Sequence, residues 1–450
     1  AVSQKKSYRD QTIPRPYEQF DLPTLSAQQM LERVLRLVAV GSDRHGLNTM
    51  DSWVGGKTVV NQRVGPLQLS VSQFAVLAAS FNGYEGHAVA QSSQPLAMLL
   101  DEDRAARLTL ATAVGNLAFV PIDGGIGGMF GSVNWCWDAK QPGETVRMYN
   151  AMRSLKDACI ELGGATPHCG KDSVSLGVTM DGRRVKSPGV CLITLHGAVT
   201  DIRKPITADI KWAGRSKLGW LNLSVGKFRL GGSGYAHACD SLGDECPDVD
   251  MKVVARGFSL IQKLVLNGLI LSGHNTAQNG LAASLVKMAM AGNSGINVNI
   301  NGDERTLFAH EAGYVFEFLH RDWPAIESEL RKHGLMDSFD EIGETGSEEN
   351  PARNKIIIGF RSDVSHEASI NVLTHVACSW YEATSDRMER EQIPADIAEA
   401  QACSLSRFTT PKWVMKAMPT SPGHFLETDR PKVAILRASG SNGHPEMAAM

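Results

Sequence analysis

Hydrophobic residues recur at helical spacing in several segments. Met30, Leu31, Val34 and Leu35 follow Ser26 at intervals of three and four, which predicts an amphipathic helix capped by Ser26. Further helices are predicted at residues 103–119, 144–162, 251–267, 281–290 and 325–333. Gly163 directly follows the segment at residues 144–162 and is a normal helix stop.

Short apolar runs between these segments predict strands. They lie at residues 67–78, 174–180, 190–195, 220–225, 296–300, 314–318 and 355–360. Asp181-Gly182 is a hairpin turn signal after the second run. Strands and helices mix without strict alternation, which favours an α+β fold with layered sheets and helices over a doubly wound parallel sheet.

Polar and proline-containing stretches suggest the domain organisation. Residues 1–24 are interpreted as a linker, and residues 204–217 as a domain joint. Residues 376–430 begin with a helical pattern and then become irregular, as in an interdomain connector. PKVAILR at residues 431–437 predicts a buried strand. Because an unpaired strand of this kind promotes aggregation, we expect a longer natural protein, of which this chain is a piece.

Composition narrows the functional classes. The chain has 450 residues, of which 43% are apolar and 21% charged, and its net charge is −3. These values fit two or three globular domains and argue against a dedicated nucleic-acid binder. No apolar run is long enough for a membrane span. Eight cysteines without a CxxC pair predict free thiols in a reducing compartment, so we expect a cytoplasmic protein.

The most suggestive local motif is Gly170-Lys171-Asp172-Ser173, predicted to lie in a polar loop before a strand. Glycine lets backbone N–H groups approach an anion, lysine supplies a positive charge, and aspartate can hold magnesium. A charged turn without function is the alternative, because the spacing of a Walker A loop is missing. No GxSxG, HExxH or GxGxxG pattern is present, so no catalytic residue is assigned.

Ten sequence blocks occur in a specific order. They are VGGK…NQRVGPLQ at 54–68, PLAMLLD…AARL at 95–108, NW…PGE at 134–144, GKDSVSL at 170–176, LGGSGYA at 230–236, LGD…CPDVD at 242–250, NGLAASLVKMAMAGNSGI at 279–296, LFAHEAGYVFEF at 307–318, W…EATSDRM at 380–388 and RPKVAILRASGSNGHPEMAAM at 430–450. Together they resemble the second synthetase half of the large, single-chain phosphoribosylformylglycinamidine synthase family. The last block resembles the start of its class I glutaminase domain.

The resemblance implies a fold and a reaction. Residues 25–205 and 215–375 would be the N-terminal and C-terminal α/β domains of an aminoimidazole ribonucleotide synthetase-like fold, and together one half of a pseudo-dimer. Residues 376–430 would be the connector, and residues 431–450 the truncated start of the glutaminase. The family is an ATP- and Mg²⁺-dependent ligase that uses glutamine to convert formylglycinamide ribonucleotide to the amidine in purine synthesis. The partners would be the missing first half and the glutaminase domain of the same chain, without which this piece should be inactive.

The resemblance also implies a second, auxiliary nucleotide–Mg²⁺ site in this half. Its family ligands are an Asp, a Glu and Asn four residues apart on a helix, and another Asp. The matching positions are Gln73, Thr112, Asn116 and Asn275, so only Asn116 keeps the family residue. Magnesium prefers charged oxygen ligands, and we therefore expect this site to be degenerate.

Two functions remain open at this point. The retained Gly170–Ser173 motif favours one half of an active synthase, in which this motif contacts nucleotide or substrate. The three lost carboxylates favour a pseudoenzyme that keeps the fold and acts in assembly or interaction. An intact catalytic histidine upstream and a glutaminase cysteine downstream would decide for the enzyme.

Overall fold

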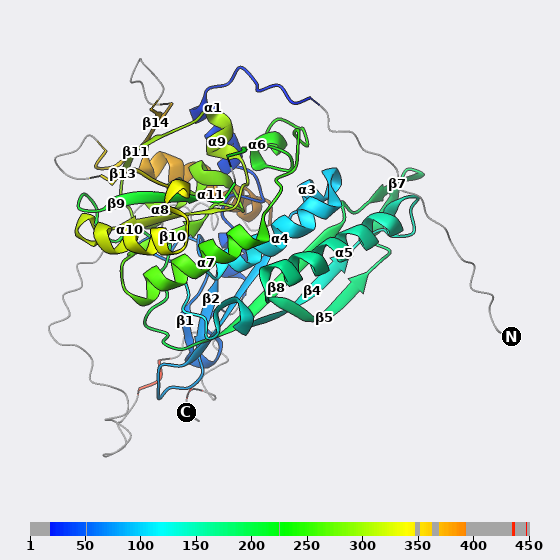
Figure 1. The fold of residues 1–450 in the computed structure, drawn as a ribbon. Helices are drawn as coiled ribbons and strands as arrows, with labels where there is room; N and C mark the ends of the chain where they lie inside the picture. Colours follow the sequence, from blue (N-terminus) through cyan, green and yellow to red (C-terminus); the bar gives the residue numbers. More distant parts are fainter. Residues whose placement is uncertain are drawn as a thin grey trace.

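A computed structural model describes residues 19–50, 52–224, 226–346, 352–361, 369–392, 434–436 and 447. Two large sheets with their helices, and a small two-stranded sheet, make up this part of the chain (Figure 1). Most of the connector lies outside the described residues. Of the buried strand expected at residues 431–437, only residues 434–436 are described, and they are exposed and belong to no strand, so the expectation is wrong at these positions. No helix among the described residues is long and apolar enough to cross a membrane.

The first sheet has six strands in the order β1-β2-β3-β8-β4-β5, and only β4 and β5 run parallel. The strands are β1 (Thr58–Val60), β2 (Ala75–Ala78), β3 (Gly86–Ser92), β8 (Val190–Val199), β4 (Met129–Cys136) and β5 (Thr166–Ser173). Helix α4 (Glu102–Asn116) packs on β3 and β8, and α5 (Glu144–Leu162) packs on α4. The opposite face of the sheet carries no helix in Figure 1 among the described residues.

The second sheet has seven strands in the order β10-β12-β9-β13-β11-β14-β15. The strands are β10 (Ser272–Asn275), β12 (Gly313–Phe318), β9 (Lys217–Asn222), β13 (Phe339–Thr345), β11 (Ile296–Ile300), β14 (Lys355–Phe360) and β15 (Ile370–Leu373). The main helices are α7 (Met251–Leu266), α8 (Gly280–Ala291) and α10 (Trp323–Lys332). Helices α1 (Ala27–Leu35) and α11 (Thr374–Gln392) pack against α8.

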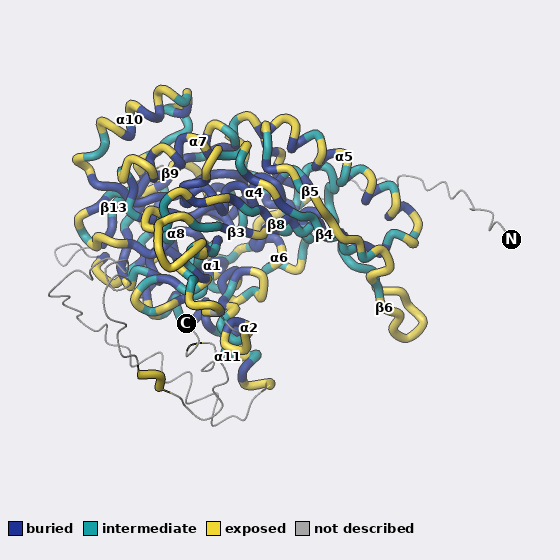
Figure 2. The backbone as a smooth tube through the Cα atoms, turned by 90° about the horizontal axis from the view of Figure 1, so that it is seen from below, coloured by how far each residue is buried: buried dark blue, intermediate teal, exposed yellow. Residues whose placement is uncertain are grey.

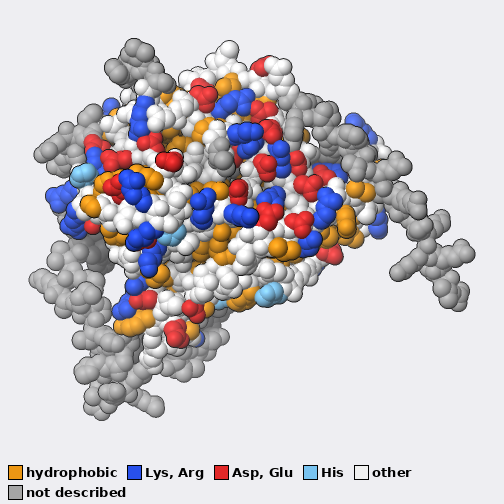
Figure 3. All heavy atoms as spheres, viewed as in Figure 1, with side chains coloured by type: hydrophobic (Ala, Val, Ile, Leu, Met, Phe, Trp, Pro, Cys, Tyr) orange, Lys and Arg blue, Asp and Glu red, His pale blue; other side chains and the backbone are white. Residues whose placement is uncertain are grey.

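Short elements complete the described fold. They are α2 (Arg44–Asn48), α3 (Pro95–Leu100), α6 (Gly234–His237), α9 (Glu304–Phe308), the hairpin strands β6 (Gly177–Met180) and β7 (Arg183–Lys186), and the 3-10 turns η1 (Val54–Gly56), η2 (Gly125–Gly128), η3 (His320–Asp322) and η4 (Met336–Ser338). Charged side chains of both signs are interspersed over the face shown in Figure 3.

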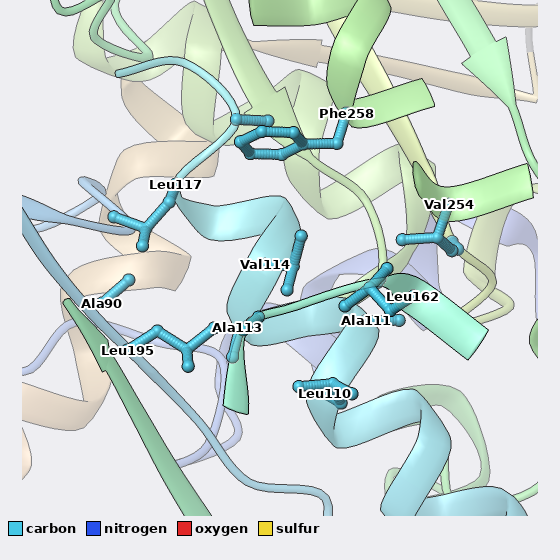
Figure 4. Close-up of a cluster of buried hydrophobic side chains, with 14 of the residues drawn as sticks. Ala90, Leu110, Ala111, Ala113, Val114, Leu117, Leu162, Leu195, Val254 and Phe258 are labelled. Carbon is cyan, nitrogen blue, oxygen red and sulfur yellow. The ribbon is translucent and has the colours of Figure 1, made fainter. Parts of the chain in front are cut away.

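One hydrophobic cluster spans both sheets. Val114 and Leu117 come from the end of α4, Leu195 from β8, and Val254 and Phe258 from α7 (Figure 4). All five side chains are at most 2% exposed. Helix α4 is therefore buried between the first sheet and the helices of the second, which brings its polar residues against β10.

The expected α+β class is confirmed, with several local corrections. The strand expected at residues 67–78 is limited to β2, because residues 64–69 form a tight turn closed by hydrogen bonds between Val64 and Leu69. The expected loop at Gly170–Ser173 is wrong, since these residues end strand β5. Helix α11 occupies the start of the expected connector, with Tyr381 buried in the core. The proposed domain boundaries stay a prediction.

Candidate site of neutral buried side chains

Four polar residues from distant parts of the sequence meet where β10 ends beside α4. The Gln73 side chain accepts a hydrogen bond from Asn275 N at 2.7 Å and donates one to Asn275 O at 3.1 Å. The Asn275 side-chain nitrogen donates to Asn116 Oδ1 at 2.9 Å and to Thr112 O at 3.1 Å. The structure thus brings together all four positions that the resemblance assigned to the auxiliary metal site.

The outer atoms of this Asn275 cluster (Gln73, Thr112, Asn116 and Asn275) are also partnered. Asn116 Nδ2 donates to Gln91 O at 3.0 Å, and Asn275 Oδ1 accepts from Ala277 N at 3.1 Å. Thr112 Oγ1 donates to Leu108 O at 2.7 Å. Because Thr112, Asn116 and Asn275 are buried, each of these bonds avoids the cost of an unsatisfied polar group.

Close packing joins the helix to the strand at this point. A Cβ atom at Gly115 would lie 2.6 Å from Asn275 Nδ2, so only glycine fits between α4 and the Asn275 carboxamide. Among the described residues, no group of three or more histidine, cysteine, aspartate or glutamate side chains is arranged to hold a metal. Asn116 is the one position that keeps the residue expected of the family's metal site. Its Oδ1 atom already accepts a hydrogen bond from the Asn275 side-chain amide.

Basic groups lie near the Asn275 cluster. His274 Nδ1 lies 2.8 Å from Asn275 O, and burial together with the charge of Lys287 lowers the pKa of His274 to about 3. Burial lowers the pKa of Lys287 to about 8, and the pKa of His310 to about 4. Lys287 Nζ lies 5.5 Å from the centre of the Tyr381 ring. A fixed cation beside neutral imidazoles opposes the binding of Mg²⁺.

Sequence reasoning missed Lys287 as a member of this environment. The signal was present, because this lysine interrupts a run of apolar residues in α8 that is buried on all sides. A charged residue in such a run indicates a specific internal environment.

The Gly170–Ser173 segment lies elsewhere, on the edge strand of the first sheet. Lys171 pairs with Asn134 of β4, and Asp172 pairs with Trp135. Successive strand residues point to opposite faces, so Lys171 and Ser173 share one face and Asp172 faces the other. Lys171 Nζ donates to Ser173 Oγ. Lys171 and Asp172 therefore cannot both contact the same phosphate group, as they could if the segment were a loop.

Lys171 faces the helix-free side of the first sheet, which carries a row of rings. His87 Nε2 lies 2.9 Å from His196 Nδ1, and Phe130 stacks on His196 with ring centres 5.7 Å apart. Burial and the charge of His87 lower the pKa of His196. Asn134 Oδ1, on the same face, is buried without a partner. This helix-free face thus combines half-buried polar groups with unused hydrogen-bonding capacity.

Comparison with known proteins shows which family and relatives the chain resembles. Residues 43–198 match the family of the FGAR-AT PurM_N-like domain. The chain is 34% identical to a probable phosphoribosylformylglycinamidine synthase of Arabidopsis thaliana, over 99% of its own length and 31% of that protein. It is 35% identical to the human phosphoribosylformylglycinamidine synthase, over 95% of its own length and 32% of that protein.

A solved structure shares the fold. Thermotoga maritima PurL complexed with FGAR superposes with a TM-score of 0.59 at 12% identity, over 79% of this chain and 54% of that one. The chain spans about a third of the length of the curated relatives. The chain therefore contains a match to the FGAR-AT PurM_N-like domain family at residues 43–198 and is similar to phosphoribosylformylglycinamidine synthases along nearly its whole length.

Proposed function

We propose that the chain is one synthetase half of an ATP- and glutamine-dependent ligase that forms formylglycinamidine ribonucleotide from formylglycinamide ribonucleotide. The observation that carries this proposal is the similarity to phosphoribosylformylglycinamidine synthases, which runs through 99% of the chain. A PurL with the same fold is complexed with FGAR, and another with AMPPCP at a TM-score of 0.52. These complexes support ATP as a cofactor of the complete enzyme. We assign Mg²⁺ to it as well, and the remaining catalytic groups to its other domains.

The Asn275 cluster has a structural role in this proposal. An auxiliary nucleotide–Mg²⁺ site would need anionic ligands, whereas Gln73, Thr112, Asn116 and Asn275 are neutral and bond to one another. The buried amides replace the ion as the link between α4 and β10. Loss of the carboxylates is then compatible with an active enzyme. In this half, the contact between α4 and β10 needs only to be rigid and does not need to bind a metal or take part in the reaction.

The helix-free face of the first sheet is the part that we assign to ligand and to the other synthetase half. Lys171 and Ser173 are proposed to contact nucleotide or substrate, and the unpartnered Asn134 Oδ1 beside them supports this assignment. Gly170 has a supporting role, since a Cβ there would lie 2.9 Å from Val133 O. Asp172 faces away and is the weakest member of the predicted set.

The cellular setting remains part of the proposal. We assign the protein to the cytoplasm because the seven cysteines among the described residues are all free thiols, as a reducing compartment allows. The partners are the first synthetase half and the glutaminase domain of the same polypeptide.

The test is ATP- and glutamine-dependent amidine formation by the purified full-length protein. Lys171→Ala should lower kcat/KM by about 10- to 100-fold, because a charge-assisted contact to ligand is lost. Lys156→Ala is the matched control, since Lys156 is a 64% exposed lysine on α5, and it should change the rate less than about twofold. A folded full-length protein without any activity would contradict the ligase assignment and favour the pseudoenzyme.

A further inference from the structure

The β6–β7 hairpin has two chemically different faces. It projects from the body just after β5, with its tip exposed (Figure 2). Gly177 pairs with Lys186 and Thr179 with Arg184, which places these residues on one face. Val178 pairs with Val185 and Met180 with Arg183, which places them on the other.

Ion pairs hold the first face against the body. Arg184 Nε lies 2.8 Å from Asp138 Oδ2, and Asp138 is fully buried. Lys186 pairs with Glu144, whose side chain is 2% exposed. A Cβ at Gly177 would lie 2.5 Å from Asp138 Oδ2, so glycine is needed where the hairpin meets this carboxylate. These contacts fix which face of the hairpin is turned inward.

The second face exposes aliphatic side chains to solvent. Val178 is 53% exposed, Met180 60% and Val185 54%, and two further residues at the hairpin base, Val174 and Leu176, are 39% and 45% exposed. A hairpin on the surface of a free-standing domain normally turns its apolar face inward and its charged face outward. This arrangement is the reverse, and an exposed apolar cluster of this kind marks a contact surface.

The size of the exposed apolar surface, formed by Val178, Met180 and Val185 on this face and by Val174 and Leu176 at the hairpin base, indicates the kind of partner. Full burial of the five side chains would remove roughly 400 Å² from solvent, about half of the ~800 Å² per partner that a stable complex of separate chains requires. A contact of this size is sufficient within one polypeptide, where a linker supplies a high effective concentration. About two thirds of each curated relative lies outside the region that this chain matches.

We propose that the apolar face of the β6–β7 hairpin docks onto another domain of the same, longer polypeptide. The inference rests on the proposed function in one respect, which is that this chain is part of such a polypeptide. The partner surface must be apolar at its centre, with an acidic or polar group facing Arg183 beside Met180.

Methionine oxidation by dilute peroxide in the full-length protein tests this docking. Sulfoxide formation follows side-chain exposure, so docking should slow oxidation of Met180 by about tenfold relative to the urea-unfolded protein. Oxidation of Met180 within about twofold of the unfolded rate would overturn the proposal. The protection should also be unchanged on 100-fold dilution, whereas loss of protection on dilution would identify a second copy as the partner and overturn the intrachain contact.

Two substitutions test whether docking, rather than another cause, protects Met180 from oxidation. Val178→Asp should return the Met180 oxidation rate toward the unfolded rate, because a carboxylate in the apolar contact would be desolvated. Val38→Asp is the control, because Val38 is 65% exposed and far from the hairpin in sequence. It should leave the Met180 oxidation rate unchanged. Persistence of protection in Val178→Asp would contradict the proposal. The readout needs no catalysis, so a full-length protein that protects Met180 but forms no amidine would refute the proposed function alone.

Discussion

Two buried polar clusters join distant segments of this chain, and they do so with opposite chemistry. The Asn275 cluster links residues 73, 112–116 and 275 through neutral amides and backbone groups. A second cluster, the Arg44 cluster, links Arg44 to three carboxylates of α11. The pair distances are 2.7 Å to Glu382, 2.7 Å to Asp386 and 2.9 Å to Glu389.

The comparison shows how charge determines what a buried cluster responds to. Neutral amides that satisfy one another are insensitive to pH and ions, because none of them titrates near neutrality. One arginine among three carboxylates leaves excess negative charge, and burial raises the pKa of Glu382 to about 7 in spite of its contact with Arg44. The first cluster should therefore act as a constant link, and the second as a link whose strength depends on pH.

The largest effect on the free energy of unfolding is expected in the Arg44 cluster. Arg44→Met leaves Glu382 and Glu389, which are 9% and 2% exposed, without their cation. The free energy of unfolding should fall by about 3–5 kcal/mol, measured by urea denaturation, because breaking a buried pair strands its charges. Arg36→Met is the control, since Arg36 forms an exposed pair with Glu32, and it should cost less than about 1 kcal/mol. Equal costs for the two substitutions would show that the Arg44 cluster is not a buried link.

A smaller effect on the free energy of unfolding is expected in the Asn275 cluster. Asn275→Asp replaces the amide that donates to Asn116 Oδ1 and Thr112 O with an acceptor, so acceptors face each other in a buried site. The free energy of unfolding at pH 7 should fall by about 2–3 kcal/mol. A variant as stable as the wild type would show that the amide donor is not needed at this position.

The smallest expected effect is the pH dependence that distinguishes the clusters. A glutamate whose pKa is raised by folding stabilises the protein below about pH 4.5, and this contribution is lost as pH rises through about 7. Glu382→Gln should therefore flatten the decline in the free energy of unfolding between these pH values, by about 1–3 kcal/mol. Glu311, whose pKa burial also raises to about 7, contributes a slope of the same sign.

The matched control for this pH experiment lies in the neutral cluster. Thr112→Val removes a neutral hydrogen bond and should lower stability equally at pH 5 and pH 7. If Thr112→Val altered the pH slope as much as Glu382→Gln, the two clusters would not differ in the way described.

Local patterns predicted much of the fold because their signals lie close together in sequence. Helix α5 has the predicted limits, with Gly163 in the left-handed conformation at its end. Ser26 caps α1 as expected, accepting a hydrogen bond from Gln29 N. Strands β11 and β14 also match, as short β-branched runs between turn residues. In contrast, β5 was missed because its glycine and charged residues disfavour a strand, and pairing with β4 overrides that preference.

The candidate site was predictable only in part. The resemblance named Gln73, Thr112, Asn116 and Asn275, and these four residues do meet through side-chain and backbone hydrogen bonds. Their hydrogen bonds, and the nearby Lys287, depend on packing between α4, β10 and α8 that no local pattern encodes. The Arg44 cluster was missed for the same reason, since more than 330 residues separate its partners.

The most direct test of the account is the nucleotide and metal content of the full-length protein, purified with ADP and Mg²⁺, for the wild type and for Asn275→Ala. If the neutral cluster has replaced a metal site, both proteins will hold the same amounts of ADP and magnesium. A tightly bound ADP–Mg²⁺ that the wild type retains and Asn275→Ala loses would contradict the account.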